Sequence, residues 1–425
     1  MSRILLTTIG SLGDLHPAVA LGFELRQRGH AVGFCVSASY QTTIEALGFQ
    51  FYPLAPDLTP LGPAAKEVIQ EIMDPRRGVE RLLRKYLFPH LQATYDDLSR
   101  AVVADGGADL LVSGELVYPA PLVAEKTGVR WAFYIAAPMS FISAYDLPVV
   151  APFPRVSAAL RPLGPTVCRA AIRFGKTITR SWSKPVRMLR AELGLKPGAD
   201  PIYEGKYSPR LVLALFSSVL ATPQPDWPEN TVVTGFPFYD GPAAPEAEAA
   251  ALRRFLSAGD SPIVFTLGSA AVLDPGNFYK ASLEAAALLQ RRAILLLGNN
   301  PPPADLPSSV LAVNYARFSQ LFPYAAVIVH QGGIGTTAQA LRAGRPMLVM
   351  PYNFDQPDNA ARVVRLGIGR TICRKDYSAA RVAGEIAQLL ENPSCLRAAQ
   401  SIAFTVQRER GAEAACDALE KLLPR

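Results

Sequence analysis

The sequence has few of the residues that build disulfides and metal sites. Its 425 residues include five cysteines, an odd and widely scattered number with no CxxC pair, and only four histidines. This pattern argues against a disulfide framework and a structural zinc site, and it favours a reducing compartment. No DxD sequence occurs, and no histidines or cysteines show ligand spacing. We therefore expect no metal-dependent mechanism.

Long apolar runs and a secretion signal are also missing. The most membrane-like stretch, residues 131–145, has 15 residues and contains Pro138, whereas a membrane-spanning helix needs roughly 20. The apolar run at the N-terminus ends at Gly10 and is too short for the core of a signal peptide. We therefore expect a cytoplasmic protein. The length and the 49% apolar content predict a globular chain of two or three domains.

Apolar runs and segments of helical period alternate in both halves of the chain. In the first half the pattern predicts strands at residues 4–9, 31–37, 49–54, 109–114 and 131–137, with helices at 17–28 and 119–127. In the second half it predicts strands at residues 263–267, 293–297, 310–313, 326–329 and 347–350, with helices at 277–290, 336–343 and 355–366. Such alternation is typical of an α/β protein, here with two Rossmann-like domains built on parallel sheets.

A proline-rich segment separates the two halves. It contains six prolines between residues 220 and 245 and shows neither a helical nor a strand period, as expected of an interdomain linker. We place an N-terminal domain at residues 1–220, a linker at 221–245 and a C-terminal domain at 246–403. Residues 380–425 are helical in pattern, and the pattern alone does not assign them to either domain.

The most informative segment is HQGGIGTT, residues 330–337, which joins a predicted strand to a predicted helix. Glycines let a ligand approach the backbone, a helix N-terminus attracts an anion, and threonine hydroxyls can donate to phosphate oxygens. A plain turn with a threonine cap is the simpler interpretation. The segment also matches the dinucleotide fingerprint GxGxxA, but too little alternating sequence follows it for that fold.

A second polar segment, PYNFDQPDN at residues 351–359, follows the next predicted strand. Open α/β sheets bind ligands at the carboxyl ends of their strands. Asp, Gln and Asn side chains together can accept from and donate to several hydroxyls, which predicts a sugar beside the phosphate site. Asp355 could instead serve only as the N-cap of the following helix.

The first domain contains a corresponding turn, GSLGDLHP at residues 10–17. It carries the best acid–base candidates of the chain, Asp14 and His16. Either could face the cleft between the domains and take a proton from a hydroxyl group. In the alternative interpretation, Asp14 only caps the helix and His16 only packs.

The net charge of +7 is concentrated in one segment. Residues 155–196 contain ten basic residues and one acid, a local net of +9. Six basic residues form one stripe of a predicted helix, with apolar residues on another: Arg169, Arg173, Lys176, Arg180, Lys184 and Arg187. Such a helix could contact an anionic membrane, although a solvated basic face is the simpler interpretation. No recognition motif accompanies the charge, so we expect no nucleic-acid partner.

Four motifs resemble the family 1-like glycosyltransferases of the GT-B fold, which include sterol glucosyltransferases and bacterial macrolide and glycopeptide glycosyltransferases. They are GSLGDLHP (10–17), LGS (267–269), HQGGIGTTAQALRAGRPMLVMP (330–351) and DQPDNA (355–360). The likeness spans nearly the whole chain. It implies two domains facing each other across a cleft, with the final helix, residues 404–425, packed back on the N-terminal domain.

The resemblance also implies roles for single residues. Asp14 takes the position of the catalytic base, with His16 beside it. The residues implied to bind the nucleotide-sugar donor are Gly13, Ser269, His330, Gly332, Gly333, Gly335, Thr336, Thr337, Asn353, Asp355 and Gln356. No glutamate pair is spaced as in the retaining enzymes of this fold, which favours inversion. The base-stacking segment of plant members is replaced by residues 315–318, which leaves the nucleotide base open.

The sequence therefore predicts an inverting, metal-independent transferase. It would move glucose from UDP-glucose to a hydroxyl of a lipophilic molecule such as a sterol, polyphenol or polyketide. The nucleotide sugar is a co-substrate, and no resident cofactor is expected. The apolar segments 51–63 and 138–154 are expected to line the acceptor pocket. A nucleotide-sugar epimerase and a non-catalytic lipid-binding module remain alternatives.

Overall fold

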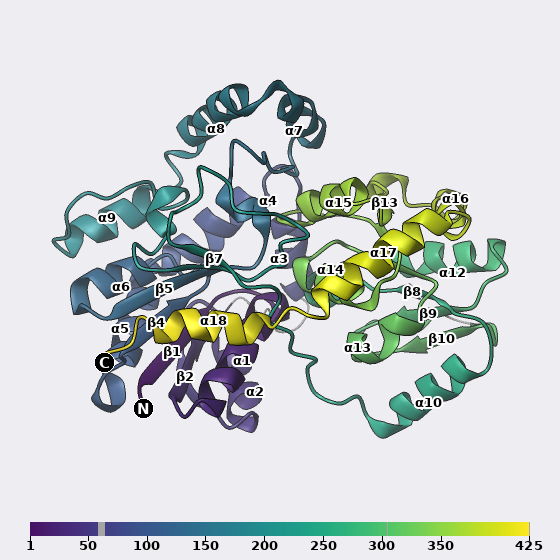
Figure 1. The fold of residues 1–425 in the computed structure, drawn as a ribbon, viewed down its shortest axis with the longest axis horizontal. Coiled ribbons are helices and arrows are strands. Elements are labelled where there is room, and N and C mark those ends of the chain that lie inside the picture. The colour runs from purple at the N-terminus through teal and green to yellow at the C-terminus, as the bar shows by residue number, and fades with distance from the viewer. Residues whose placement is uncertain (58–63, 304, 425) are drawn as a thin grey trace.

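The computed structural model describes residues 1–57, 64–303 and 305–424, and it contains two parallel sheets side by side (Figure 1). The N-terminal sheet has the strand order β3-β2-β1-β4-β5-β6-β7, and the C-terminal sheet has the order β10-β9-β8-β11-β12-β13. Helices cover both sheets. The predicted fold class, an α/β protein with two Rossmann-like domains, is therefore confirmed.

The strands and helices of the N-terminal sheet and its surroundings come first in the chain. The strands are β1 (Arg3–Thr8), β2 (Ala31–Val36), β3 (Gln50–Pro53), β4 (Leu110–Ser113), β5 (Arg130–Ile135), β6 (Val212–Ala214) and β7 (Thr231–Val233). The helices are α1 (Leu12–Gln27), α2 (Gln41–Ala46), α3 (Ala64–Ile72), α4 (Gly78–Arg81), α5 (Leu91–Val103), α6 (Ala120–Thr127), α7 (Pro154–Leu160), α8 (Pro165–Thr179) and α9 (Lys184–Glu192).

The C-terminal sheet and its helices follow, together with the two last helices of the chain. The strands are β8 (Ile263–Phe265), β9 (Ala293–Leu296), β10 (Val310–Val313), β11 (Val327–His330), β12 (Met347–Val349) and β13 (Gly369–Thr371). The helices are α10 (Glu246–Ser257), α11 (Gly268–Ala271), α12 (Phe278–Leu288), α13 (Phe318–Leu321), α14 (Ile334–Ala343), α15 (Gln356–Arg365), α16 (Ala379–Leu390), α17 (Pro393–Val406) and α18 (Gly411–Glu420).

Three strands were not predicted, and each has three residues, too few to show a period. They are β6, β7 and β13. β7 lies inside the segment predicted to be the linker, and it pairs with β6. The N-terminal sheet therefore continues to Val233, and the connection between the two sheets is shorter than predicted.

The segment expected to be one basic helix forms separate helices. α8 ends at Thr179 and α9 begins at Lys184, so the six basic residues do not share one stripe, and the single-helix prediction is wrong. The helical period continues across the turn between α8 and α9, so the sequence pattern did not separate the two helices. Each of them has a proline in its first turn, Pro165 in α8 and Pro185 in α9. Lys176 is ion-paired with Glu204, and Arg187 lies 3.7 Å from Asp200.

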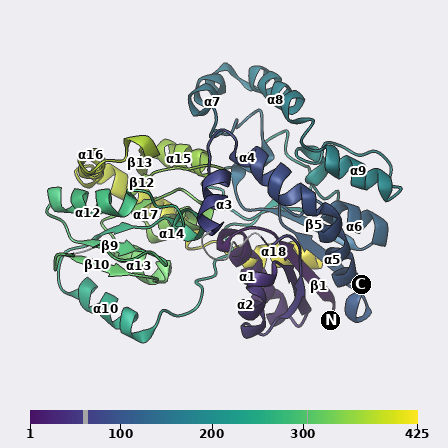
Figure 2. The same cartoon turned by 180° about the vertical axis from the view of Figure 1, so that it is seen from behind.

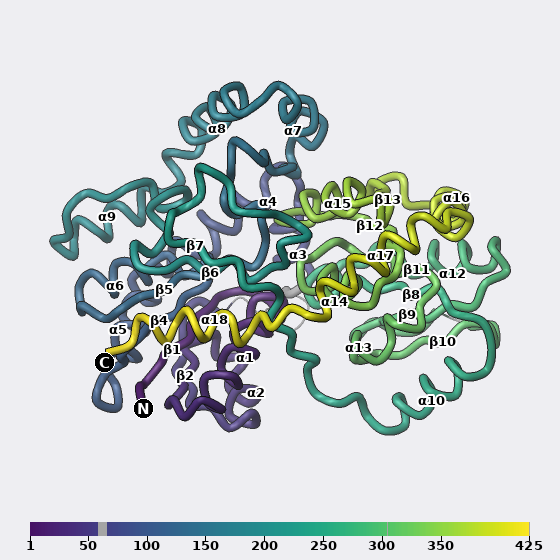
Figure 3. Tube along the Cα trace, viewed as in Figure 1, coloured from purple at the N-terminus to yellow at the C-terminus, as the bar shows by residue number. Residues whose placement is uncertain are grey.

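The end of the chain crosses from one domain to the other (Figures 1 and 3). α17 contacts α14, and α18 contacts α1. Cys416 and Leu419 of α18 are fully buried in the core formed by α1, β1 and β2. At the rim of this contact, Arg28 pairs with Asp417 at 2.6 Å and with Glu420 at 2.9 Å.

A helix from the N-terminal half also packs against the C-terminal domain (Figure 2). Ile69 in α3 and Met73 just after it are buried in the apolar core of that domain, beside Tyr352. Gln70 donates a hydrogen bond to the carboxylate of Asp274 at 3.0 Å. In the described part of the chain, no helix is long and apolar enough to cross a membrane.

Candidate active site

The segment predicted to bind phosphate forms the turn between β11 and α14. α14 begins at Ile334, and Gly335 is exposed at its first turn, where a Cβ atom would meet nothing within 4 Å among the described residues. The backbone N–H groups of Gly335 and Thr336 have no partner in the described chain. Free N–H groups at a helix N-terminus attract an anion, so this turn offers an open phosphate site.

His330 adds a hydrogen-bond donor to this site. The N–H of Gly332 donates to its Nδ1 at 3.0 Å, which assigns the ring proton to Nε2. Nε2 is buried and has no partner among the described residues. Burial lowers the pKa of His330 to about 3, so the ring is neutral. His330 therefore presents one N–H donor without a positive charge.

The two threonines of the segment differ in what their hydroxyls contact. The hydroxyl of Thr337 donates to the carbonyl of Gly333 at 3.0 Å, inside the helix. No described residue hydrogen-bonds the hydroxyl of Thr336, although that residue is buried. Of these two hydroxyls, only that of Thr336 is therefore free to donate a hydrogen bond to a ligand.

Asp355 connects the segment predicted to bind the sugar, residues 351–359, to the segment predicted to bind phosphate, residues 330–337. Its Oδ2 accepts the N–H of Ile334 at 2.9 Å and the side-chain amide of Asn359 at 2.7 Å. It makes no side-chain cap on its own helix, α15, so the interpretation as a simple N-cap of that helix is wrong. Burial, with a contribution from the charge of Asp14, raises the pKa of Asp355 to about 7.

Hydrogen bonds with the backbone orient the side-chain amides of Gln356 and Asn353, which lie on either side of Asp355. The Oε1 of Gln356 accepts the N–H of Tyr352 at 2.8 Å, which leaves the Nε2 group as its donor. The amide of Asn353 donates to the carbonyls of Ile72 and Asp74 at 2.9 and 3.1 Å, so it contacts the N-terminal half. Ser269 lies exposed on the short helix α11.

Asp14 sits in the first turn of α1. The helix begins at Leu12 rather than at Pro17, because Ser11 forms a capping box: its hydroxyl accepts the N–H of Gly13 at 3.2 Å, and Asp14 accepts the N–H of Ser11 at 2.8 Å. The prediction that Asp14 and His16 lie on a glycine loop is therefore wrong. No described residue hydrogen-bonds the second carboxylate oxygen of Asp14.

Burial raises the pKa of Asp14 to about 6, and the charge of Glu115 adds to this rise. Glu115 lies two residues after β4 and accepts hydrogen bonds from Lys206 and from the Ser140 hydroxyl, both at 2.6 Å. It was not predicted from the sequence. Its position one residue beyond Gly114, at the carboxyl end of a buried strand, was the signal that could have found it.

His16 packs against the connection between the two sheets. Its ring meets Tyr239 edge to face, with ring centroids 5.1 Å apart. No described residue hydrogen-bonds the ring, and burial lowers its pKa to about 4. This geometry matches the packing interpretation of His16, and it leaves Asp14, which also caps α1, as the acid–base candidate of the turn.

A cavity lies next to Glu115 in the N-terminal domain. Its walls come from the start of α6, from β5, from α9 and from residues 198–206. Apolar and aromatic side chains line it together with charged ones: Val117, Tyr118, Leu122, Trp131, Phe133 and Val186, and Glu115, Arg187, Arg190 and Lys206. The segments 51–57 and 138–154 do not line it. Residues 58–63 of the expected acceptor-lining segment lie outside the described residues. Across the described ranges, no group of three or more His, Cys, Asp or Glu side chains could hold a metal ion.

Comparison with known proteins identifies the family of the chain. Residues 4–98 match the Glycosyltransferase family 28 N-terminal domain, and residues 282–415 match the Erythromycin biosynthesis protein CIII-like C-terminal domain. The O-mycaminosyltylonolide 6-deoxyallosyltransferase of Streptomyces fradiae is 32% identical, over 99% of this chain and 97% of that protein. The chain belongs to the GT-B glycosyltransferases. The family predicted from the four motifs is thereby confirmed.

Other relatives and solved structures are similar to this glycosyltransferase over nearly its whole length. The sterol 3-beta-glucosyltransferase of Arabidopsis thaliana is 26% identical over 99% of this chain and 68% of that protein. Among solved structures, the spinosyn forosaminyltransferase SpnP has a TM-score of 0.70 at 21% identity, with 99% of each chain covered. The structure of glycosyltransferase VinC in complex with dTDP has a TM-score of 0.66 at 20% identity, again with 99% of each covered. Both structures show the same fold.

The raised pKa values predict how the glycosyltransferase responds to pH. If Asp14 must be ionised to accept a proton, kcat/KM should fall by about tenfold per pH unit below pH 6.

The fold holds the protons of Asp14 and Asp355 more tightly than the unfolded chain does, where an aspartate titrates near 3.8. These two groups therefore stabilise the fold more at pH 5 than at pH 7. Rate profiles and thermal unfolding between pH 5 and 8 test both statements, and a flat rate profile would contradict the first.

Proposed function

We propose that this glycosyltransferase moves glucose from UDP-glucose to a hydroxyl of a lipophilic acceptor, with inversion at the anomeric carbon and with Asp14 as the general base. The observation that carries the proposal is the turn from β11 into α14, where the N–H groups of Gly335 and Thr336 have no partner in the described chain and Asp355 accepts the N–H of Ile334. Asp14 of the other domain is close enough for its charge to contribute to the raised pKa of Asp355, which supports a base near the sugar.

The chemistry follows from the groups on each side. Asp14 takes the proton of the acceptor hydroxyl, and the hydroxyl oxygen forms a bond to the anomeric carbon as the bond to the diphosphate breaks. The departing diphosphate gains negative charge. It would be stabilised by the N–H groups of Gly335 and Thr336 and by Nε2–H of His330, which have no partner among the described residues.

Donor recognition divides between two parts of the C-terminal domain. The α14 turn would hold the diphosphate, while the free oxygen of Asp355 and Nε2 of Gln356 would contact sugar hydroxyls. Arg317, in the segment that replaces the base-stacking motif, donates to the carbonyls of Gly241 and Pro242 instead. Since the related VinC was solved with dTDP, a TDP-sugar is the second donor to test.

Glu115 lies on the acceptor side of the base, and its charge adds to the rise in the pKa of Asp14. The cavity that Glu115 lines has a volume of about 60 Å³, which is too small for a ring system, so a lipophilic acceptor would lie outside it. The names of relatives, which act on a macrolide and on sterols, agree with this class of acceptor.

Release of nucleoside diphosphate tests the proposal. UDP-glucose and TDP-glucose are incubated with the enzyme and EDTA, with and without a panel of hydrophobic hydroxylated acceptors. We expect acceptor-stimulated release and a glycosylated product of inverted configuration. Release that does not depend on an acceptor would favour an epimerase or hydrolase. The absence of both release and binding with either donor would favour a lipid-binding module.

Contact with an anionic membrane stays a prediction. Val167, Phe174 and Ile178 leave one face of α8 apolar and exposed, and Arg169 and Arg173 lie exposed on another face. Salt-sensitive co-sedimentation with anionic vesicles is the result expected if this helix meets a membrane surface. Failure to co-sediment at low salt would remove the idea.

A further inference from the structure

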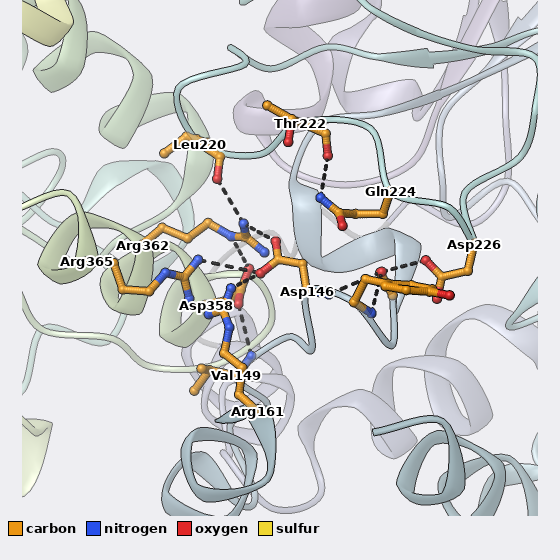
Figure 4. A network of polar contacts seen from close by, with 12 residues as sticks. Asp146, Val149, Arg161, Leu220, Thr222, Gln224, Asp226, Asp358, Arg362 and Arg365 are labelled. Atoms are coloured by element: carbon orange, nitrogen blue, oxygen red, sulfur yellow. Dashed lines mark hydrogen bonds and ion pairs between the residues drawn. The ribbon is translucent and has the colours of Figure 1, made fainter. Parts of the chain in front are cut away.

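The helix that carries Gln356, and that follows Asp355, also fastens the two domains together (Figure 4). Asp358 lies in the first turn of α15 and is fully buried, and Arg362 lies one turn further along with 2% of its side chain exposed. Nε of Arg362 donates to Asp358 at 2.6 Å. One end of α15 therefore faces the donor site, and its flank carries a buried ion pair.

Both members of this pair contact the N-terminal domain. Nη1 of Arg362 donates to the carboxylate of Asp146 at 2.6 Å and to the carbonyl of Leu220 at 2.9 Å. Asp358 accepts the backbone N–H of Val149 at 3.0 Å. Asp146 and Val149 lie in the segment after β5, and Leu220 lies after β6, so α15 is held at two neighbouring loops of the N-terminal sheet.

Asp146 is shared by cations from both domains. Arg161 of its own domain and Arg362 of α15 donate to it, and Arg365 lies 3.7 Å from it. Separating the domains would leave Arg362 without Asp146 and Leu220, and it would leave Asp358 without Val149. Removing one partner of a buried charge pair is strongly unfavourable. This network therefore favours the arrangement of the domains in which it is complete.

We propose that Arg362 is a positioning residue, which holds α15 against the N-terminal domain so that Asp355 and Gln356 face Asp14 for transfer. The inference rests on the proposed function. Arg362 touches no part of the donor site; it acts through the helix. Its guanidinium donates to three acceptors from two domains, and a lysine at this position offers a single ammonium group.

The test compares Arg362→Met with Arg365→Met. Arg365 lies on the same helix and faces the same aspartate, but its side chain is 37% exposed and its contact is longer. Arg362→Met should lower kcat by about 100-fold, the scale expected when reacting groups are displaced by about 1 Å. Arg365→Met should lower it by less than about threefold, the effect of an exposed ion pair. UDP affinity should stay within about threefold in both variants, because the α14 donors all lie in the C-terminal domain.

A distance measurement separates positioning from simple loss of structure. Cys373 is exposed on the C-terminal domain, while the other four cysteines are buried. Labels on Cys373 and on an added Glu192→Cys in α9 report the separation of the domains by energy transfer. We expect Arg362→Met to lower the transfer efficiency, Arg362→Lys to restore part of kcat, and Arg365→Met to resemble the wild type.

Two results for kcat would overturn the inference directly. One is a kcat for Arg362→Met within about threefold of the wild type. Another is an equal loss in Arg365→Met. If Arg362→Met no longer binds UDP, Asp146→Asn decides from the opposite domain: loss of kcat with UDP binding retained supports the inference, and unchanged kcat overturns it. If the wild type transfers no sugar, the proposed function fails; unchanged energy transfer in Arg362→Met would then overturn the domain contact as well.

Discussion

Asp14→Asn is expected to lower kcat by about 1,000-fold, because a positioned general base contributes about 100- to 10,000-fold and an amide cannot accept the proton. Asparagine keeps the size of the side chain, and its carbonyl oxygen can still accept the N–H of Ser11 that now bonds Asp14 at 2.8 Å. The cap of α1 should therefore persist. UDP affinity should be unchanged, since the proposed diphosphate contacts lie in the other domain. Steady-state kinetics and UDP titration measure the two quantities.

His16→Ala is the matched control for this prediction. His16 lies two residues further along the same helix and packs against Tyr239 without a hydrogen bond. Its loss should reduce stability more than catalysis. If Asp14→Asn retains activity and His16→Ala loses it at unchanged folded fraction, the assignment of the base is wrong.

Thr336→Ala is expected to lower kcat by about 100-fold, the typical effect of removing one donor that stabilises developing negative charge. The adjacent Thr337→Ala is a close comparison, because the Thr337 hydroxyl already donates to the carbonyl of Gly333 inside the helix. It should lose less than about tenfold. Both values come from turnover at saturating donor and acceptor. Equal effects of the two substitutions would show that the hydroxyl of Thr336 has no special role.

The parts of the site that could be predicted are contiguous in sequence. The turn from β11 into α14 uses eight successive residues, 330–337, so its glycines and threonines identified it directly. Asp14 was found in the same way, as an acid in a strand-to-helix turn. Capping by Asp14 was among the alternatives, but its partner Ser11 was not predicted, because the helix was expected to begin at Pro17, a residue that α1 contains in its interior.

The parts of the site and of the domain contact that could not be predicted depend on pairs of residues that are distant in sequence. Arg362 and Asp146 are 216 positions apart, and Lys206 and Glu115 are 91 apart. No local pattern distinguishes these side chains from solvated charges. The same limit applies to Asp355: its motif was visible, but its hydrogen bond to Ile334 of another helix was not, so a cap on its own helix was the natural alternative.

The position of α18 has a consequence for how the chain is synthesised. Ala415, Cys416 and Leu419 fill the core that also contains Leu6, Leu21 and Phe34, residues made at the opposite end of the chain. The N-terminal domain therefore emerges from the ribosome hundreds of residues before its core can close. Until the last helix arrives, this apolar face of α1 is open to water and to other nascent chains. Truncation before Gly411 should therefore destabilise the domain at the opposite end of the sequence from the cut.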